Sequence, residues 1–198
     1  KETGSALVYF AFFLMLYREG MSGSFLFTGV AMIIYFIIGI RYAEPTIWDI
    51  PTSVGHFSVL LLVQVFTSAL VWVYCKDSNT AKTIFGYCVG ITIGSLLFAE
   101  YVIPFDIVWV QLILCAAMVG YLLYCVLEQR IRQYFFIMLF ALGSITFFYS
   151  ADYVLNHVMQ PHQRVRINVL LGLEQDLAGA GYNVHQSEIA IGPGGLEG

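Results

Sequence analysis

The sequence predicts an all-α fold: a polytopic transmembrane bundle of about six helices that carries one large extracellular loop. The 198-residue chain is 59% hydrophobic and only 11% charged, whereas a soluble domain is about half apolar and a quarter charged. Long apolar runs of roughly twenty residues, the length that spans a bilayer, alternate with short polar turns. Residues 163–198 are instead polar and rich in glycine. The net charge of -4 gives no indication of nucleic-acid binding.

Helices are the only reasonable structure for apolar runs of this length, because lipid leaves no partner for an open backbone group. Gly20 is a natural end for the first helix, and Asp106 can cap the fifth. The segment between the second and third helices holds two prolines and is expected to be a loop. The six expected helices cover residues 6–17, 25–40, 54–75, 80–103, 107–127 and 131–155.

The basic residues predict the orientation of the bundle. The first, third and fifth turns hold Arg18, then Lys76 and Lys82, then Arg130 and Arg132, whereas the second and fourth turns hold only Arg41. Lysine and arginine are enriched in cytoplasmic turns. The amino end of the chain and residues 163–198 are therefore expected outside the cell.

Two features inside the predicted helices call for a packing role rather than a catalytic one. Gln64 and Gln111 lie within apolar runs, and interhelical hydrogen bonding explains such amides better than ligand binding does. Gly86, Gly90 and Gly94 recur every four residues on one helix face. This spacing favours close helix packing, with another helix of the bundle as the preferred partner and another protein as the alternative.

We expect two parts in the chain, a transmembrane bundle over residues 1–155 and a partial extracellular catalytic loop over residues 156–198. The chain begins and ends inside sequence motifs, so we expect it to be an internal fragment, and the family resemblance given below implies further helices on both sides. Such a fragment would be inactive alone, because part of the cavity would be missing.

The polar segment offers several candidate groups. A helix over residues 162–173 would be amphipathic and would hold Arg164 and Arg166 at headgroup level, where they could attract anionic lipid or clamp a pyrophosphate. Asp176 could act as a general base or hold a divalent cation, although most single loop carboxylates are simply solvated. The spacing of His157, His162 and His185 fits no zinc pattern, so no metal site is expected there.

A longer pattern runs through the same segment, and it resembles the large extracellular loop of the SEDS family (shape, elongation, division and sporulation proteins). The agreement extends over more than thirty positions in residue type and spacing. Three departures occur: Leu177-Ala178 stands for Pro-Leu, Asn183 for Gln, and Pro193 for Ser. The matching residues are Gln163, Arg166, Ile167, Asp176, the run 179–182, Gln186, Ser187 and the run 189–192.

The resemblance implies a peptidoglycan glycosyltransferase of the bacterial inner (cytoplasmic) membrane that polymerises lipid II into glycan strands during cell elongation. It implies undecaprenyl pyrophosphate as leaving group and a class B penicillin-binding protein, a transpeptidase, as partner. Asp176 matches the essential loop aspartate of the family, and a divalent cation at Asp176 is the one cofactor considered. The substrate-binding residues implied by the motifs are Arg166, Gln163, Tyr182, Gln186, Ser187 and Glu2. Glu2 takes the Asp position where residues 1–5 match the tail of the motif Q-P-D-L-G-T, although the same residues also suit a plain helix start with Thr3 or Ser5 as N-cap.

Two other functions stay open at this point: a flippase or transporter for lipid-linked precursors, and a non-catalytic scaffold of the wall-synthesis complex. Transport favours ionisable groups at mid-membrane depth, and the apolar runs carry almost none. A scaffold would not need the matched, charged loop. The chain also has about six helices between the two family motifs, where shorter family members have about two.

Overall fold

The computed structural model describes residues 15, 18, 20, 22–48, 50–160, 163 and 167 of the chain. Within this part, five helices are long and apolar enough to cross a membrane. The expectation of an all-α, multi-pass membrane protein is therefore confirmed, while the expected first helix over residues 6–17 lies almost wholly outside the described residues. Gly20 does have a φ of 104°, the left-handed conformation expected where a helix ends at glycine.

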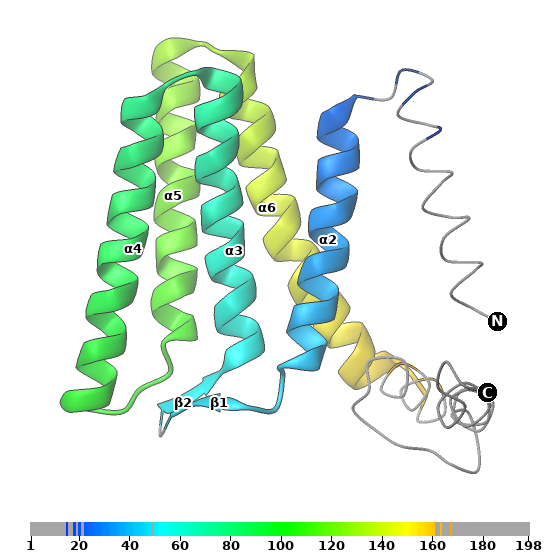
Figure 1. Cartoon of the computed structure of the whole chain (residues 1–198), viewed down its shortest axis with the longest axis vertical. Helices are drawn as coiled ribbons and strands as arrows, with labels where there is room; N and C mark the ends of the chain where they lie inside the picture. The colour runs from blue at the N-terminus through cyan, green and yellow to red at the C-terminus, as the bar shows by residue number, and fades with distance from the viewer. Residues whose placement is uncertain are drawn as a thin grey trace, which may run out of the picture. The chain divides into compact units, whose positions relative to one another are not determined.

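The spanning helices run up and down through the bundle (Figure 1). Their bounds differ from the expected ones by a few residues at most, because apolar length sets where a spanning helix can begin and end. Two of them end in a π-helical turn, Val71–Cys75 (η1) after α3 and Val154–Val158 (η2) after α6. The helices are α2 (Gly23–Arg41), α3 (Val54–Leu70), α4 (Ser78–Tyr101), α5 (Val108–Gln129) and α6 (Arg132–Tyr153).

Helix α3 lies at the centre of the bundle and contacts α2, α4 and α5. A chain of buried amides and a hydroxyl joins three of these helices. Gln64 of α3 donates to the side-chain oxygen of Gln111 on α5 over 2.6 Å, and Gln111 donates to the hydroxyl of Thr92 on α4 over 2.8 Å. Gln111 is fully buried, and Gln64 is nearly so. The two amides thus form interhelical hydrogen bonds, as their place in apolar runs predicts.

The glycine face of α4 does not pack against another described helix, in contrast to what its spacing predicts. A Cβ atom built at Gly86, Gly90 or Gly94 would meet nothing within 4 Å. Among the described helices, no neighbour packs closely against this face, so the preferred prediction of packing within the bundle is wrong for this part of the chain. Four-residue glycine spacing shows that close approach is possible, but it does not say whether a neighbour is present.

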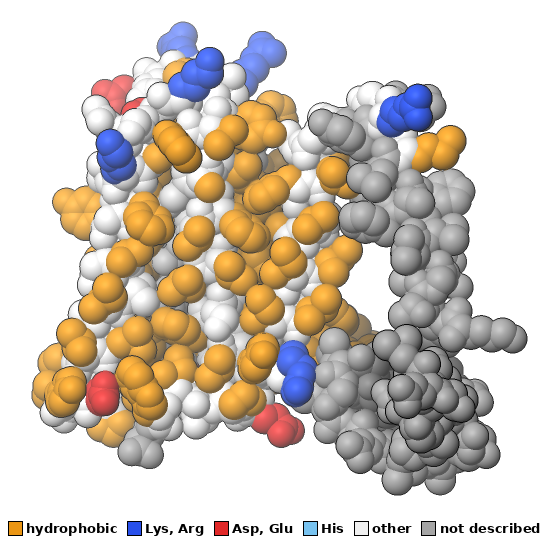
Figure 2. Space-filling model, viewed as in Figure 1, with side chains coloured by type: hydrophobic (Ala, Val, Ile, Leu, Met, Phe, Trp, Pro, Cys, Tyr) orange, Lys and Arg blue, Asp and Glu red, His pale blue; other side chains and the backbone are white. Residues whose placement is uncertain are grey.

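The turns at one end of the bundle carry most of the described cations (Figure 2). At this end, Asp77 caps α4, because its carboxylate accepts hydrogen bonds from the backbone N–H groups of Asn79 and Thr80 and from the Thr80 hydroxyl. The same carboxylate accepts from the hydroxyl of Tyr134 on α6 over 2.9 Å. One short acidic side chain therefore ties the start of α4 to the start of α6.

At the opposite end, the segment expected to be a loop contains a short antiparallel hairpin of β1 (Thr46–Ile47) and β2 (Ile50–Ser53). The hairpin is held against the start of α5 by Thr52, whose hydroxyl donates to Asp106 and accepts from the backbone N–H of Ile107. Asp106 also accepts from the N–H of Val108, the first residue of α5. Asp106 thus accepts from the first N–H of α5, as predicted, but Ile107 is the N-cap residue itself, and Thr52 is an unforeseen partner.

Candidate functional site

The predicted site follows the end of α6 that lies away from the cationic turns. Gly39 of α2 packs against the Phe148 ring so closely that a Cβ atom at position 39 would overlap it. The His56 ring of α3 meets the same phenylalanine edge to face, with 5.2 Å between ring centroids. These contacts bring α2, α3 and α6 together at the end of the bundle away from the cationic turns, which we call the outer end because the basic residues predict that it faces outside the cell.

Residues Lys1–Phe148 and Tyr149–Gly198 form two separate compact units. In the second unit, the last turn of α6 and η2 present a polar face that the sequence reasoning missed. Asn156 donates to the carboxylate of Asp152 over 3.0 Å, and the rings of Tyr153 and His157 stack with centroids 4.8 Å apart. Both pairs have i,i+4 spacing, which places side chains together on a helix. The i,i+4 spacing is the sequence signal from which these two pairs could have been predicted.

Met159 then turns to an extended conformation and ends the helix. Gln163 begins the next segment, where its backbone N–H donates to the carbonyl of Gln160 over 2.9 Å. Its side-chain oxygen in turn accepts from the Gln160 N–H over 3.4 Å. Gln163 is exposed at the start of the predicted loop.

Gln163 and Ile167 are the two motif residues that the structure describes. The other predicted site residues lie outside the described residues, and their roles stay predictions: Asp176, Arg166, Tyr182, Gln186, Ser187 and Glu2. The described polar groups therefore lie next to the predicted site in sequence. They are the carboxylate of Asp152, the amides of Asn156 and Gln163, and the ring of His157. These groups can donate to and accept from a polar ligand, but they do not by themselves define a reaction.

The carboxyl-terminal part of the chain matches a known protein family. Residues 109–198 match the model of the FtsW, RodA and SpoVE family, described as "Cell cycle protein". The match begins near the start of α5 and includes α6 and the polar segment. Helices α2, α3 and α4 precede it.

Individual relatives agree with this match. The chain is 38% identical over 82 residues, 41% of its length, to "Peptidoglycan glycosyltransferase RodA" of Treponema pallidum. It is 54% identical over 41 residues, 21% of its length, to "Peptidoglycan glycosyltransferase MrdB" of Escherichia coli K12. The matches span 18% and 11% of these relatives, so the chain corresponds to less than a fifth of their length. No solved structure matches the chain significantly.

Proposed function

We propose that the protein, whose residues 109–198 are a RodA-like part of the SEDS family, is a peptidoglycan glycosyltransferase that polymerises lipid II during cell elongation. The observation that supports this most directly is the family match across the polar segment, together with the relatives' shared description as peptidoglycan glycosyltransferases. We place the protein in the bacterial inner membrane and propose a class B penicillin-binding transpeptidase as its partner.

The reaction requires a group that accepts the proton of the attacking hydroxyl and groups that stabilise the leaving pyrophosphate. We assign the first role to Asp176, which stands at the position of the family's loop aspartate. Arg166 suits the second role, because a guanidinium group can hydrogen-bond two phosphate oxygens at once. Gln163, at the start of the same segment, is proposed to contact the donor headgroup through its side-chain amide. Glu2, Tyr182, Gln186 and Ser187 are proposed as further substrate contacts.

The helices that precede the family match have a supporting role in this proposal. The hydrogen bonds from Gln64 to Gln111 and from Gln111 to Thr92 tie α3 and α4 to α5, which lies within the matched region. The buried polar side chains of the described spans are hydroxyls and amides. Such groups support helix association, whereas a transport path would call for ionisable groups. Glycosyl transfer is therefore the function we favour over transport.

Polymerisation of lipid II by the purified full-length protein with its transpeptidase partner is the test. Asp176→Asn keeps the size of the side chain and removes its charge, and loss of a positioned base lowers a rate by about 10²–10⁴-fold. Glu174→Gln is the matched control, because Glu174 is a nearby carboxylate outside the motif; it should keep near-normal activity. Arg166→Ala should weaken donor binding or slow the departure of pyrophosphate. Near-normal product from Asp176→Asn would refute the assignment.

A divalent cation held by Asp176 is the alternative to direct base catalysis. We propose no geometry for it, since Asp176 lies outside the described residues. Chelation with EDTA separates the two roles: activity that survives chelation supports the base, whereas activity that is lost and then restored by Mg²⁺ or Mn²⁺ supports the cation.

A further inference from the structure

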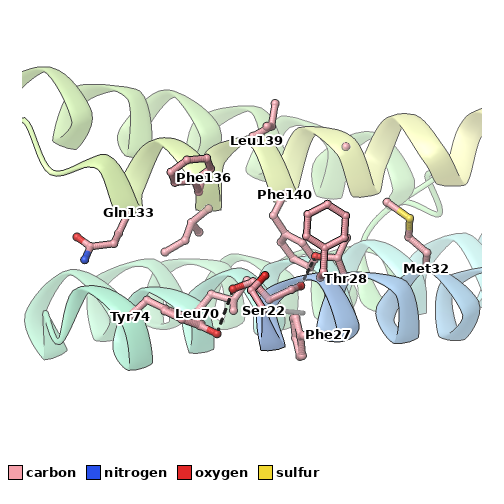
Figure 3. A pocket seen from close by; sticks show the side chains of 14 residues that line it. Ser22, Phe27, Thr28, Met32, Leu70, Tyr74, Gln133, Phe136, Leu139 and Phe140 are labelled. Atoms are coloured by element: carbon pink, nitrogen blue, oxygen red, sulfur yellow. Dashed lines mark hydrogen bonds between the residues drawn. The ribbon is translucent and has the colours of Figure 1, made fainter. Parts of the chain in front are cut away.

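A cavity of about 550 Å³ lies between α2, the end of α3 with η1, and the first half of α6. Its volume is in the range of small-molecule sites in proteins, about 300–1,000 Å³. Figure 3 shows the side chains around it, with Phe27 and Thr28 from α2, Tyr74 from η1, and Phe136 and Phe140 from α6. None of the residues that line the cavity is one to which the proposed glycosyl transfer assigns a role.

The cavity exists because α2 and α6 approach each other most closely at Gly39 and Phe148, whereas nearer the cationic end the two rings of Phe27 and Phe140, with centroids 5.7 Å apart, reach across a wider gap. At the outer end, Gly39 abuts Phe148. Thr28, eleven residues earlier in α2, lines the cavity, and this separation is about 16 Å along a helix at 1.5 Å per residue. The gap between α2 and α6 therefore opens toward the cationic end of the bundle.

The lining changes from apolar to polar along the cavity. Phe27, Met32, Leu70 and Phe140 contribute its apolar walls, whereas Ser22, Ser24, Tyr74 and Gln133 lie toward the cationic end. Ser24 donates to the Tyr74 hydroxyl over 3.4 Å at this polar mouth. One side is open, since Phe25 and Phe136 are 74% and 64% exposed. An apolar slot with a polar mouth suits an amphiphile whose chain enters sideways from the bilayer.

The charges around the mouth favour an anionic headgroup. Arg132 precedes the lining residue Gln133, Lys76 follows Tyr74 by two residues, and Arg18 precedes Ser22 by four; all three cations are exposed. The acids described at this end are Asp77 and the exposed Glu128, against the five cations Arg18, Lys76, Lys82, Arg130 and Arg132. Asp77 is already engaged by the N–H groups of Asn79 and Thr80 and by the hydroxyls of Thr80 and Tyr134. The exposed cations therefore keep a net attraction for phosphate.

We propose that this cavity binds one acyl chain of an anionic phospholipid from the cytoplasmic leaflet. The chain lies among the phenylalanine rings, and the phosphate lies at the level of Ser22, Tyr74 and Gln133, beside Arg132. A single cation near an anionic group contributes a factor of about five to binding. The site should therefore prefer phosphatidylglycerol to phosphatidylcholine with the same chains by at least about fivefold.

The first experiment measures lipid retention by native mass spectrometry of the full-length protein in detergent. Dioleoyl phosphatidylglycerol and dioleoyl phosphatidylcholine are added separately. Gly143→Leu fills the cavity, since Gly143 lines it and a Cβ atom there meets nothing within 4 Å. This variant should lose most of the bound phosphatidylglycerol. Gly120→Leu is the matched control: its position on α5 is also open within 4 Å but does not line the cavity. Equal retention in both variants would contradict the proposal.

The second experiment removes charge and leaves the cavity walls intact. Arg132→Gln should lower the preference for phosphatidylglycerol about fivefold, while Arg41→Gln, at the other end of α2, should leave it unchanged. Equal binding of phosphatidylglycerol and phosphatidylcholine by the parent protein would show that the cavity does not select an anionic headgroup, and would overturn that part of the proposal.

The third experiment needs no variant that could fail to fold. Phosphatidylglycerol with a diazirine in its acyl chain should crosslink to peptides of α2 and α6 in the unmodified protein. Crosslinks spread evenly over the bundle would show annular lipid only. A photoreactive phenylalanine analogue at position 136 that captured residues 6–17 would show instead that a segment of the chain itself fills the cavity.

Discussion

At the residue scale, the buried amides of Gln64 and Gln111 depend on each other. Gln64 donates to Gln111, which donates to Thr92. Removing one amide leaves buried polar groups of its partners unsatisfied, at a cost of about 1–3 kcal/mol. Removing both amides leaves fewer such groups and fills the same space with apolar atoms.

We therefore expect Gln64→Leu and Gln111→Leu each to lower stability by about 1–2 kcal/mol, and the double variant to lose less than the sum. The coupling should lie between about 0.6 and about 1.7 kcal/mol, the average and the maximum for interhelical hydrogen bonds in a membrane protein. Thermal unfolding of the purified protein in detergent measures it. Strictly additive losses would mean that the two amides do not act as a pair. Lipid II polymerisation by the double variant should stay near normal.

Asp77 makes stability depend on pH. The hydroxyl and backbone N–H of Thr80, helped by Tyr134 and Asn79, hold the pKa of this carboxyl below its usual range. A carboxyl with a lowered pKa stabilises the folded state fully above its unfolded pKa of about 4, and this contribution is lost as pH falls through the folded value.

Asp77→Ala should consequently cost about 0.5–2 kcal/mol at pH 7, the usual loss for a helix cap. The difference from the parent should shrink at an acid pH below the folded pKa of this carboxyl, where the parent also loses its carboxylate. Tyr134→Phe removes one of the four hydrogen bonds and should have a smaller effect. Unfolding curves of the parent and of Asp77→Ala at the two pH values test this. A difference in the free energy of unfolding that stayed constant would exclude Asp77 as the titrating group.

At the element scale, the outer hairpin is held by one threonine. Thr52 is fully buried and bonds both Asp106 and the Ile107 N–H. Thr52→Val keeps the shape of the side chain but leaves the buried N–H without this acceptor, so we expect a loss of about 1–3 kcal/mol. Thr46→Val, at an exposed position of β1, is the control and should change little. Melting temperatures of the two variants test the assignment.

The sequence predicted the spanning helices well because apolar length is a strong local signal. It also predicted Asp106 as a partner for the start of α5, since an acid after a proline break is a local pattern. It did not predict the hairpin, whose short strands depend on Thr52 meeting a turn more than fifty residues away. It likewise could not show that the glycine face of α4 lacks a close neighbour among the described helices, because packing depends on which helices lie nearby.

At the scale of the whole molecule, orientation is the testable property. The basic residues of the odd turns predict that these turns lie in the cytoplasm. In intact cells, a cysteine at position 185 should therefore react with an impermeant maleimide, and a cysteine at position 78 should react only after the membrane is opened. A background without the four native cysteines avoids interference. Protection at position 185 together with reaction at position 78 would reverse the topology.

The candidate site was predicted less completely than the fold. Motif spacing identified Gln163 as a site residue, and the structure finds this residue exposed at the start of the polar segment. The pairs Asp152–Asn156 and Tyr153–His157 were missed, although their spacing was visible, because single polar residues near a helix end are common. The cavity beside α2 could not be predicted at all, since it arises from the angle between two helices far apart in sequence.

The close contacts at the outer end of α2 have a mechanical consequence. Gly55 lies so near the Gly39 carbonyl that a Cβ atom would come within 2.6 Å of it, and its N–H bonds the Tyr42 carbonyl over 2.7 Å. Backbone held against backbone acts as a pivot. The other end of α2 is held by side chains, since Phe27 meets Phe66 with 5.3 Å between ring centroids and Ser24 donates to Tyr74 over 3.4 Å. Side chains can adjust by changing rotamer, so a tilt of α2 changes the width of the cavity more than it moves Gly39. An acyl chain in the cavity can therefore set the angle of α2 while the contact between Gly39 and Phe148 changes little. The chain continues from Phe148 toward the polar segment.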